Sequence, residues 1–150
     1  MERPISDMQD WNISTSEVGD IVCVRLDSDD GIILTKGYSS RRKFIVIVGF
    51  TPEGIALGAL LINSKVSPIK QSPELLNSQY PLLARNYRSF LKYDSWLDCS
   101  DIFELSTEKI EGKGGFYIGK LIEDDKERVL AYLKDSDLID IFTKQRFGLL

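Results

Sequence analysis

The fold is decided by residues 42–63, which comprise RKFIVIVGF (42–50), TPEG (51–54) and IALGALLIN (55–63). Two apolar runs of strand length flank a turn in which Pro52 presets the backbone and Gly54 can take a positive φ. This pattern predicts a β-hairpin. Both runs are nearly continuous rather than alternating, which indicates that each face of the hairpin is covered. We therefore expect the hairpin at the centre of a small curled sheet.

Further strands are predicted on both sides of this hairpin. In Val18–Leu26, a turn at Gly19-Asp20 is followed by a β-branched run, so this segment is predicted to form the first strand. A short strand is expected at Ile32–Thr35. After the hairpin, strands are expected at Asn86–Tyr93 and, beyond a bend, at Ser95–Leu105.

From Leu121 the apolar residues take the spacing of a helix. Ile122, Val129, Leu130 and Leu133 fall on one face of that helix. Three acidic residues, 123–125, occupy its first turn, where the helix dipole favours negative charge. The pattern predicts an amphipathic helix that ends near Lys134.

These elements predict one domain and its class. We expect a loose lead-in over residues 1–17, a single barrel domain over 18–134, and a tail over 135–150 that adds a short helix. Within the domain, residues 64–93 form a long excursion, whose first part is rich in proline and is expected to hold a short helix near residues 74–76. The fold class is mainly β with α: a small SH3-like barrel of five to six strands with a C-terminal amphipathic helix.

The composition excludes several kinds of chemistry. The 150 residues contain no histidine, which removes Ser-His-Asp and Cys-His catalysis and histidine-ligated metals. Cys23 and Cys99 are isolated, so neither a disulfide framework nor a four-ligand zinc site is expected, and both are interpreted as buried apolar residues, with one reactive thiol as the alternative. We expect no cofactor, no metal, no membrane span and a cytoplasmic protein.

The charge is segregated along the chain. The net charge is −4, but residues 31–93 hold nine bases and two acids, while residues 1–30 and 94–150 carry net charges of −6 and −5. Such segregation predicts a local positive surface on an acidic protein, although chance clustering on a solvated face accounts for it as well.

The order of five short motifs resembles that of the PemK/MazF toxin family. The motifs are Gly19-Asp20 opening the first strand, Arg42-Lys43 leading into the central strand, Asn63-Ser64 ending the next, Asp98 followed by a strand, and Gly119-Lys120-Leu121 before the last helix. The resemblance covers roughly residues 18–134. It implies an SH3-like barrel and a type II toxin that acts as a metal-independent endoribonuclease on single-stranded RNA, with an antitoxin or a second copy of the chain as partner.

The resemblance also implies site residues. In the family reaction the RNA's 2′-hydroxyl attacks the adjacent phosphate, so Arg42 would clamp the phosphate, Ser64 would donate a hydroxyl and Asp98 would be the carboxylate. Each has a plainer alternative. Arg42 could pair with a carboxylate, Ser64 could be a turn residue, and Asp98 could bond the local backbone.

Bases and aromatic residues alternate near the end of the excursion, which suggests RNA binding. Phosphates attract cations and splayed bases stack on aromatic rings, so Arg41, Lys43, Tyr87, Arg88 and Lys92 are expected to bind RNA. On a strand, however, Tyr87 and Tyr93 would face one side while Arg88 and Lys92 face the other, so an amphipathic strand with its aromatics in the core is the competing interpretation.

The sequence leaves two functions open. Lys43 stands where the family usually has proline, Asn63-Ser64 replaces a threonine pair, and Trp96-Leu97 occupies positions where active members often carry a base. The catalytic set is therefore incomplete. The alternative to an RNA-cleaving toxin is a non-catalytic SH3-like interaction or nucleic-acid-binding domain.

Overall fold

A computed structural model describes residues 9–10, 15–28, 37, 40–66, 72–112 and 115–150. Its centre is the hairpin formed by β3 (Arg41–Phe50) and β4 (Ala56–Asn63). The turn between them is closed by a hydrogen bond of 3.0 Å from Thr51 N to the carbonyl oxygen of Ala56, and Gly54 takes a φ of 72°. The predicted hairpin is confirmed.

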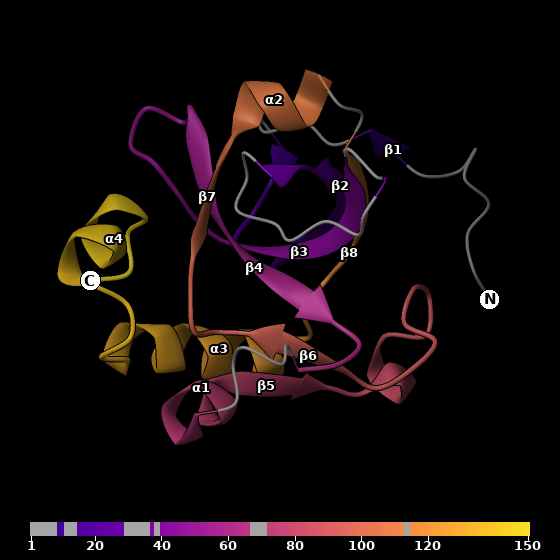
Figure 1. Ribbon diagram of the computed structural model, residues 1–150. Coiled ribbons are helices and arrows are strands. Elements are labelled where there is room, and N and C mark those ends of the chain that lie inside the picture. Colours follow the sequence, from indigo (N-terminus) through magenta and orange to yellow (C-terminus); the bar gives the residue numbers. More distant parts are fainter. Residues whose placement is uncertain (1–8, 11–14, 29–36, 38–39, 67–71, 113–114) are drawn as a thin grey trace.

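Among the described residues, the hairpin lies inside an antiparallel sheet of eight strands in the order β1-β8-β2-β3-β4-β6-β5, with β7 also paired to β4. The remaining strands are β1 (Gln9–Asp10), β2 (Asp20–Leu26), β5 (Gln79–Leu82), β6 (Ser95–Asp98), β7 (Phe103–Ser106) and β8 (Phe116–Lys120). Figure 1 shows that the sheet curls into a half-barrel. The predicted class, mainly β with an SH3-like barrel, is confirmed. The strand count exceeds the predicted five to six because short strands also join both edges of the sheet.

The helices of the described residues are α1 (Pro73–Asn77), the 3-10 helix η4 (Ala84–Asn86), α2 (Thr107–Gly112), α3 (Glu123–Asp135) and α4 (Ile141–Arg146). Figure 1 shows α2 on one side of the curl and α3 on the other. The short helix predicted near residues 74–76 and the amphipathic helix predicted to end near Lys134 are both confirmed. The C-terminal tail holds α4, the short helix expected there.

The alternation of side chains along β3 divides the core in two. Val46 and Val48 join a cluster with Val129 and Leu133 of α3, so we call this side the α3 face. Ile45 and Ile47 join a second cluster with Ile110 of α2, on what we call the α2 face. Burial of both faces explains why the two runs of the hairpin are continuously apolar.

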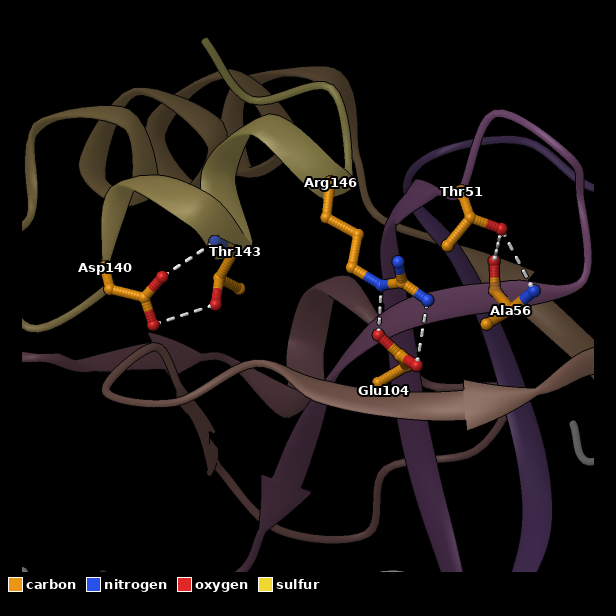
Figure 2. A network of polar contacts seen from close by, with 6 residues as sticks. All are labelled: Thr51, Ala56, Glu104, Asp140, Thr143 and Arg146. Carbon is orange, nitrogen blue, oxygen red and sulfur yellow. Dashed lines mark hydrogen bonds and ion pairs between the residues drawn. The ribbon is translucent and has the colours of Figure 1, made fainter.

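The tail after α3 is fixed to the sheet by packing and by polar contacts. Phe147 is 4% exposed and lies in the α3-face cluster, against Gly49 of β3. Figure 2 shows Arg146 of α4 bound to Glu104 of β7 through two hydrogen bonds, and Asp140 capping α4 by accepting from Thr143 N at 2.8 Å. The last helix is thus part of the packed structure.

Two strand predictions are wrong. Asn86 ends the 3-10 helix η4, and residues 87–93 form tight turns in which the carbonyl of Tyr87 accepts from Phe90 N and Leu91 N. A strand is not formed there because Tyr87 and Leu91 pack inward at a spacing of four residues. Ser95–Leu105 is interrupted between β6 and β7, where Asp98 Oδ1 accepts from Ser100 N at 3.0 Å and turns the chain.

Three further predictions concern a short strand, the N-terminal lead-in and membrane-spanning segments. The strand expected at Ile32–Thr35 lies outside the described residues. In the lead-in, Gln9 and Asp10 pair with Tyr117 and Phe116 of β8. Over the described ranges, no helix has both the length and the apolar character needed to cross a membrane.

Candidate nucleic-acid interface

The basic residues 41–43 lie at one end of the sheet, where β3 begins and β4 ends. The register pairs Phe44 with Ile62, so Arg42 and Ser64, each two residues further out on its side of the hairpin, lie at the same open end. Both residues are exposed. The structure therefore brings together two of the three residues expected to be catalytic, and we call this end of the sheet the basic rim, defined by Arg25, Arg41, Arg42, Lys43, Asn63, Ser64 and Lys65.

Arg42 is oriented by weak contacts. Its Nη1 lies 3.9 Å from Cys23 Sγ, and its guanidinium lies 6.0 Å from the centre of the Phe116 ring. Its partner across β2 is another cation, Arg25. Among the residues that the structure describes, no carboxylate lies within ion-pair distance of Arg42, so the alternative of a local ion pair is not realised there. Its charge is available to an anion.

Lys43 occupies the opposite face of the same strand. It is 8% exposed and its Nζ donates to Asn63 Oδ1 at 2.5 Å. Burial, with a smaller contribution from the neighbouring Arg41, lowers the pKa of Lys43 to about 8. A buried lysine that bonds a neutral amide keeps its positive charge unneutralised.

Asp98 lies elsewhere and is buried. It is 5% exposed, and its Oδ1 accepts from Gln79 Nε2 at 2.9 Å, from Ser100 N at 3.0 Å and from Ser100 Oγ at 2.6 Å. Its neighbour Leu97 belongs to the α3-face cluster and pairs with Ile62, which directs Asp98 away from the face that carries Arg42. Asp98 and Arg42 therefore do not form one solvent-exposed site. The hydrogen bond from Ser100 N to Asp98 is the local backbone contact that the alternative interpretation of Asp98 expects.

The end of the excursion packs beside the basic rim. The ring of Phe90 meets that of Phe44 edge-on, with centroids 5.3 Å apart, and so places this segment next to the strand that carries Arg42. Arg88 and Lys92 flank Phe90 and are exposed. Tyr87 is 5% exposed, and its hydroxyl donates to Asp125 Oδ2, so its ring is not open to a base.

Two side chains at or beside the basic rim have no binding role in the sequence-based predictions: Asn63, which belongs to the rim, and Trp96, which lies next to it. Trp96 is 37% exposed on β6 and is the cross-strand partner of Asn63. The signal for Asn63 was its place as the polar end of an apolar run. Trp96 had no such signal, since its neighbours across the sheet depend on the register of β6.

Several cations at this end of the molecule have no carboxylate partner among the described residues. Elsewhere Lys109, Arg128 and Arg146 have the carboxylate partners Asp27, Asp124 and Glu104. In the described parts of the chain, no such pair involves Arg41, Arg42, Arg88 or Lys92. No group of three or more Cys, Asp and Glu side chains within those parts is placed to hold a metal ion. The arrangement is suited to binding a polyanion.

Comparison with known proteins places the fold. No family model and no curated protein sequence matches the chain. Among solved structures, the chain is similar to one from the MazE-MazF complex of Deinococcus radiodurans, with a TM-score of 0.51 and 10% sequence identity over 79% of this chain and 92% of that chain. The chain thus has a MazF/PemK-like fold, as the order of its motifs predicts.

Proposed function

We propose that this MazF/PemK-like chain is the toxin of a toxin-antitoxin pair and binds single-stranded RNA at the basic rim in the cytoplasm. The observation that carries the proposal is the set of exposed cations without carboxylate partners at one end of the sheet, where Arg42 and Ser64 both lie at the open end of the hairpin. An antitoxin and a second copy of the chain are the proposed partners. Phosphates of RNA would supply the negative charge that these cations lack as partners.

Cleavage would follow the geometry of Arg42 and Ser64. The 2′-hydroxyl of the RNA would lose its proton to water, and its oxygen would bond to the adjacent phosphorus as the bond from phosphorus to the 5′-oxygen breaks. The products would be a 2′,3′-cyclic phosphate and a 5′-hydroxyl that takes its proton from water. The Arg42 fork would donate to two phosphorane oxygens, and the Ser64 hydroxyl would add a third donor. We do not assign proton transfer to Asp98, because three hydrogen bonds already occupy its buried Oδ1.

The burial of Asp98 favours a second candidate, a domain that binds RNA without cleaving it. A site without a positioned base would lose the contribution of general acid-base catalysis, about 10²–10⁴-fold in rate. Binding needs only the cations and the exposed surface around them. The two candidates share the basic rim and differ in whether RNA is cut.

One assay separates them. Purified protein is incubated with single-stranded RNA in EDTA, and the products are examined for 2′,3′-cyclic phosphate ends. We expect the wild type to cut, and Arg42→Ala and Ser64→Ala to cut more slowly by about 10²–10³-fold, the usual loss of one donor to a developing oxyanion. Arg128→Ala is the matched control, because it removes an exposed arginine that is paired with Asp124 on α3.

The outcomes are distinct. Cutting that Arg42→Ala slows by about 10²–10³-fold and Arg128→Ala leaves unchanged supports the ribonuclease. Intact RNA that nevertheless binds to the wild type supports the non-catalytic candidate. RNA that is neither cut nor bound would overturn both.

A further inference from the structure

Trp96 is an aromatic residue that the two hydrophobic clusters do not include. It is 37% exposed, although a tryptophan side chain typically buries about 150–250 Å² in a core or an interface. In the sheet it stands between Asn63 of β4 and Pro81 of β5, each its direct cross-strand partner. Directly opposite residues have Cβ atoms about 4.5–5.5 Å apart, so these three side chains form one row on the sheet.

The amide of Asn63 has a fixed orientation beside this tryptophan. Lys43 Nζ can only donate, so the Asn63 oxygen must face it, as the 2.5 Å hydrogen bond records. The amide nitrogen then points away from Lys43, and within the described residues it has no hydrogen-bond acceptor. Asn63, which is half-buried, thus offers two N–H groups to a ligand next to Trp96.

Cations surround the same row. Arg41 and Lys43 alternate with Arg42 along β3, so they lie on the face of the strand that carries Asn63 and Trp96 across the sheet. Lys65 follows two residues after Asn63 and is exposed. A flat aromatic surface and positive charge are the features with which proteins bind single-stranded nucleic acid, and a fixed donor can add a hydrogen bond to the edge of an unpaired base.

We propose that Trp96 is the stacking platform for one unpaired base of the RNA, with the Asn63 amide donating to an acceptor on that base's edge. This inference rests on the proposed function and adds to it a base-binding subsite at the same end of the sheet, on the face that carries Lys43 rather than the face that carries Arg42. The phosphates on either side of the stacked base would lie toward Arg41 and Lys65. Base contact of this kind gives the basic rim a preference for unpaired RNA over a duplex, whose bases are stacked on each other.

The test uses the fluorescence of Trp96 and a probe that cannot be cut. Since the chain has two tryptophans, Trp11→Phe leaves Trp96 as the only one. The probe is a fluorescently labelled 2′-O-methyl RNA hexamer, compared with the same backbone carrying abasic residues. We expect the hexamer, but not the abasic backbone, to quench Trp96. By anisotropy, Trp96→Ala should bind the hexamer about 5- to 150-fold more weakly, the range for loss of one stacked base.

Two further variants sharpen the test. Phe142→Ala is the matched control, because it removes an aromatic side chain that is 78% exposed on α4, and it should bind like the wild type. Asn63→Asp keeps a partner for Lys43 but removes both amide donors. We expect it to weaken binding of the hexamer more than binding of the abasic backbone. Circular dichroism of each variant establishes that it is folded.

The failure of this inference differs from the failure of the proposed function. If the hexamer binds and Arg42→Ala weakens it, while Trp96→Ala changes nothing and Trp96 fluorescence is constant, the subsite is refuted and the RNA-binding function stands. If Trp96→Ala alters only the oligomeric state in sedimentation, Trp96 belongs to an interface between copies and the subsite is likewise refuted. If no oligonucleotide binds, both proposals are refuted.

Discussion

Replacing Tyr87 with phenylalanine tests how the excursion is held to α3. The Tyr87 hydroxyl donates to Asp125 Oδ2 at 2.5 Å and accepts from Ile122 N at 3.1 Å, and it is buried with the Asp125 carboxylate. A hydrogen bond to a charged group contributes about 1.5–3 kcal/mol and a neutral one about 1 kcal/mol. Tyr87→Phe should therefore lower the free energy of unfolding by about 2–4 kcal/mol, equivalent to a fall in Tm of about 4–16 °C.

Tyr80→Phe is the control for this prediction. The Tyr80 hydroxyl makes one hydrogen bond, to Asp125 Oδ1 at 2.5 Å, and is only half-buried, so its loss should cost less than that of Tyr87. Urea unfolding followed by circular dichroism measures both variants. A Tyr87→Phe protein within about 0.5 kcal/mol of the wild type, the usual range for surface substitutions, would refute this account of the contact.

The pH dependence of the stability provides a second test of the contacts that Tyr80 and Tyr87 make with Asp125. Burial and, after it, the hydrogen bond to Asp125 raise the pKa of both phenols above their ordinary value of 10.0. The neutral phenols therefore stabilise the fold fully below pH 10, and this stability is lost as the pH rises beyond the pKa of the unfolded chain. In Tyr87→Phe the alkaline loss should be smaller than in the wild type.

Two more substitutions test the sheet itself. Burial lowers the pKa of Lys43 from 10.5 to about 8, so the charged form of Lys43 destabilises the fold below pH 8. In urea unfolding, the stability of the wild type relative to Lys43→Met should therefore rise by up to about 3 kcal/mol between pH 8 and pH 10.5. A difference in stability that does not change with pH would contradict this. A Cβ on Gly49 would collide with the carbonyl oxygen of Phe147, whereas one on Gly112 would meet nothing within 4 Å. Gly49→Ala should therefore lower the free energy of unfolding by about 1–3 kcal/mol and Gly112→Ala should leave it nearly unchanged, and equal stability of the two variants would refute the packing of the tail.

The centre of the fold could be predicted from the sequence because its signals are local. The hairpin at 41–63 has its turn chemistry and its apolar runs within one continuous segment, and α3 has its helical period within thirteen residues. Asn86–Tyr93 was mistaken for a strand because aromatic and basic residues alternate there. The inward packing of Tyr87 depends on Asp125, which lies 38 residues further along the chain, and no local pattern records it.

The site was predictable only in part, for the same reason. Arg42 and Ser64 lie at the two open ends of one hairpin, so local sequence alone brings them together. The order of motifs points to Asp98 as the carboxylate, but Gln79 and Ser100 hold it inside the fold. The pairing of Trp96 with Asn63 depends on the register of β6 against β4, which a sequence pattern does not specify.

The most direct test of the account is the salt dependence of RNA binding. Anisotropy of an uncleavable 2′-O-methyl hexamer is titrated with wild type, Arg42→Ala and Arg128→Ala at several salt concentrations. If the basic rim holds the RNA, the slope of log K against log salt for Arg42→Ala should be shallower by about 0.7, the value for one contact to a single strand, while Arg128→Ala keeps the slope of the wild type. Equal slopes for the two variants, or no binding by the wild type at low salt, would contradict the assignment of the basic rim as the RNA site.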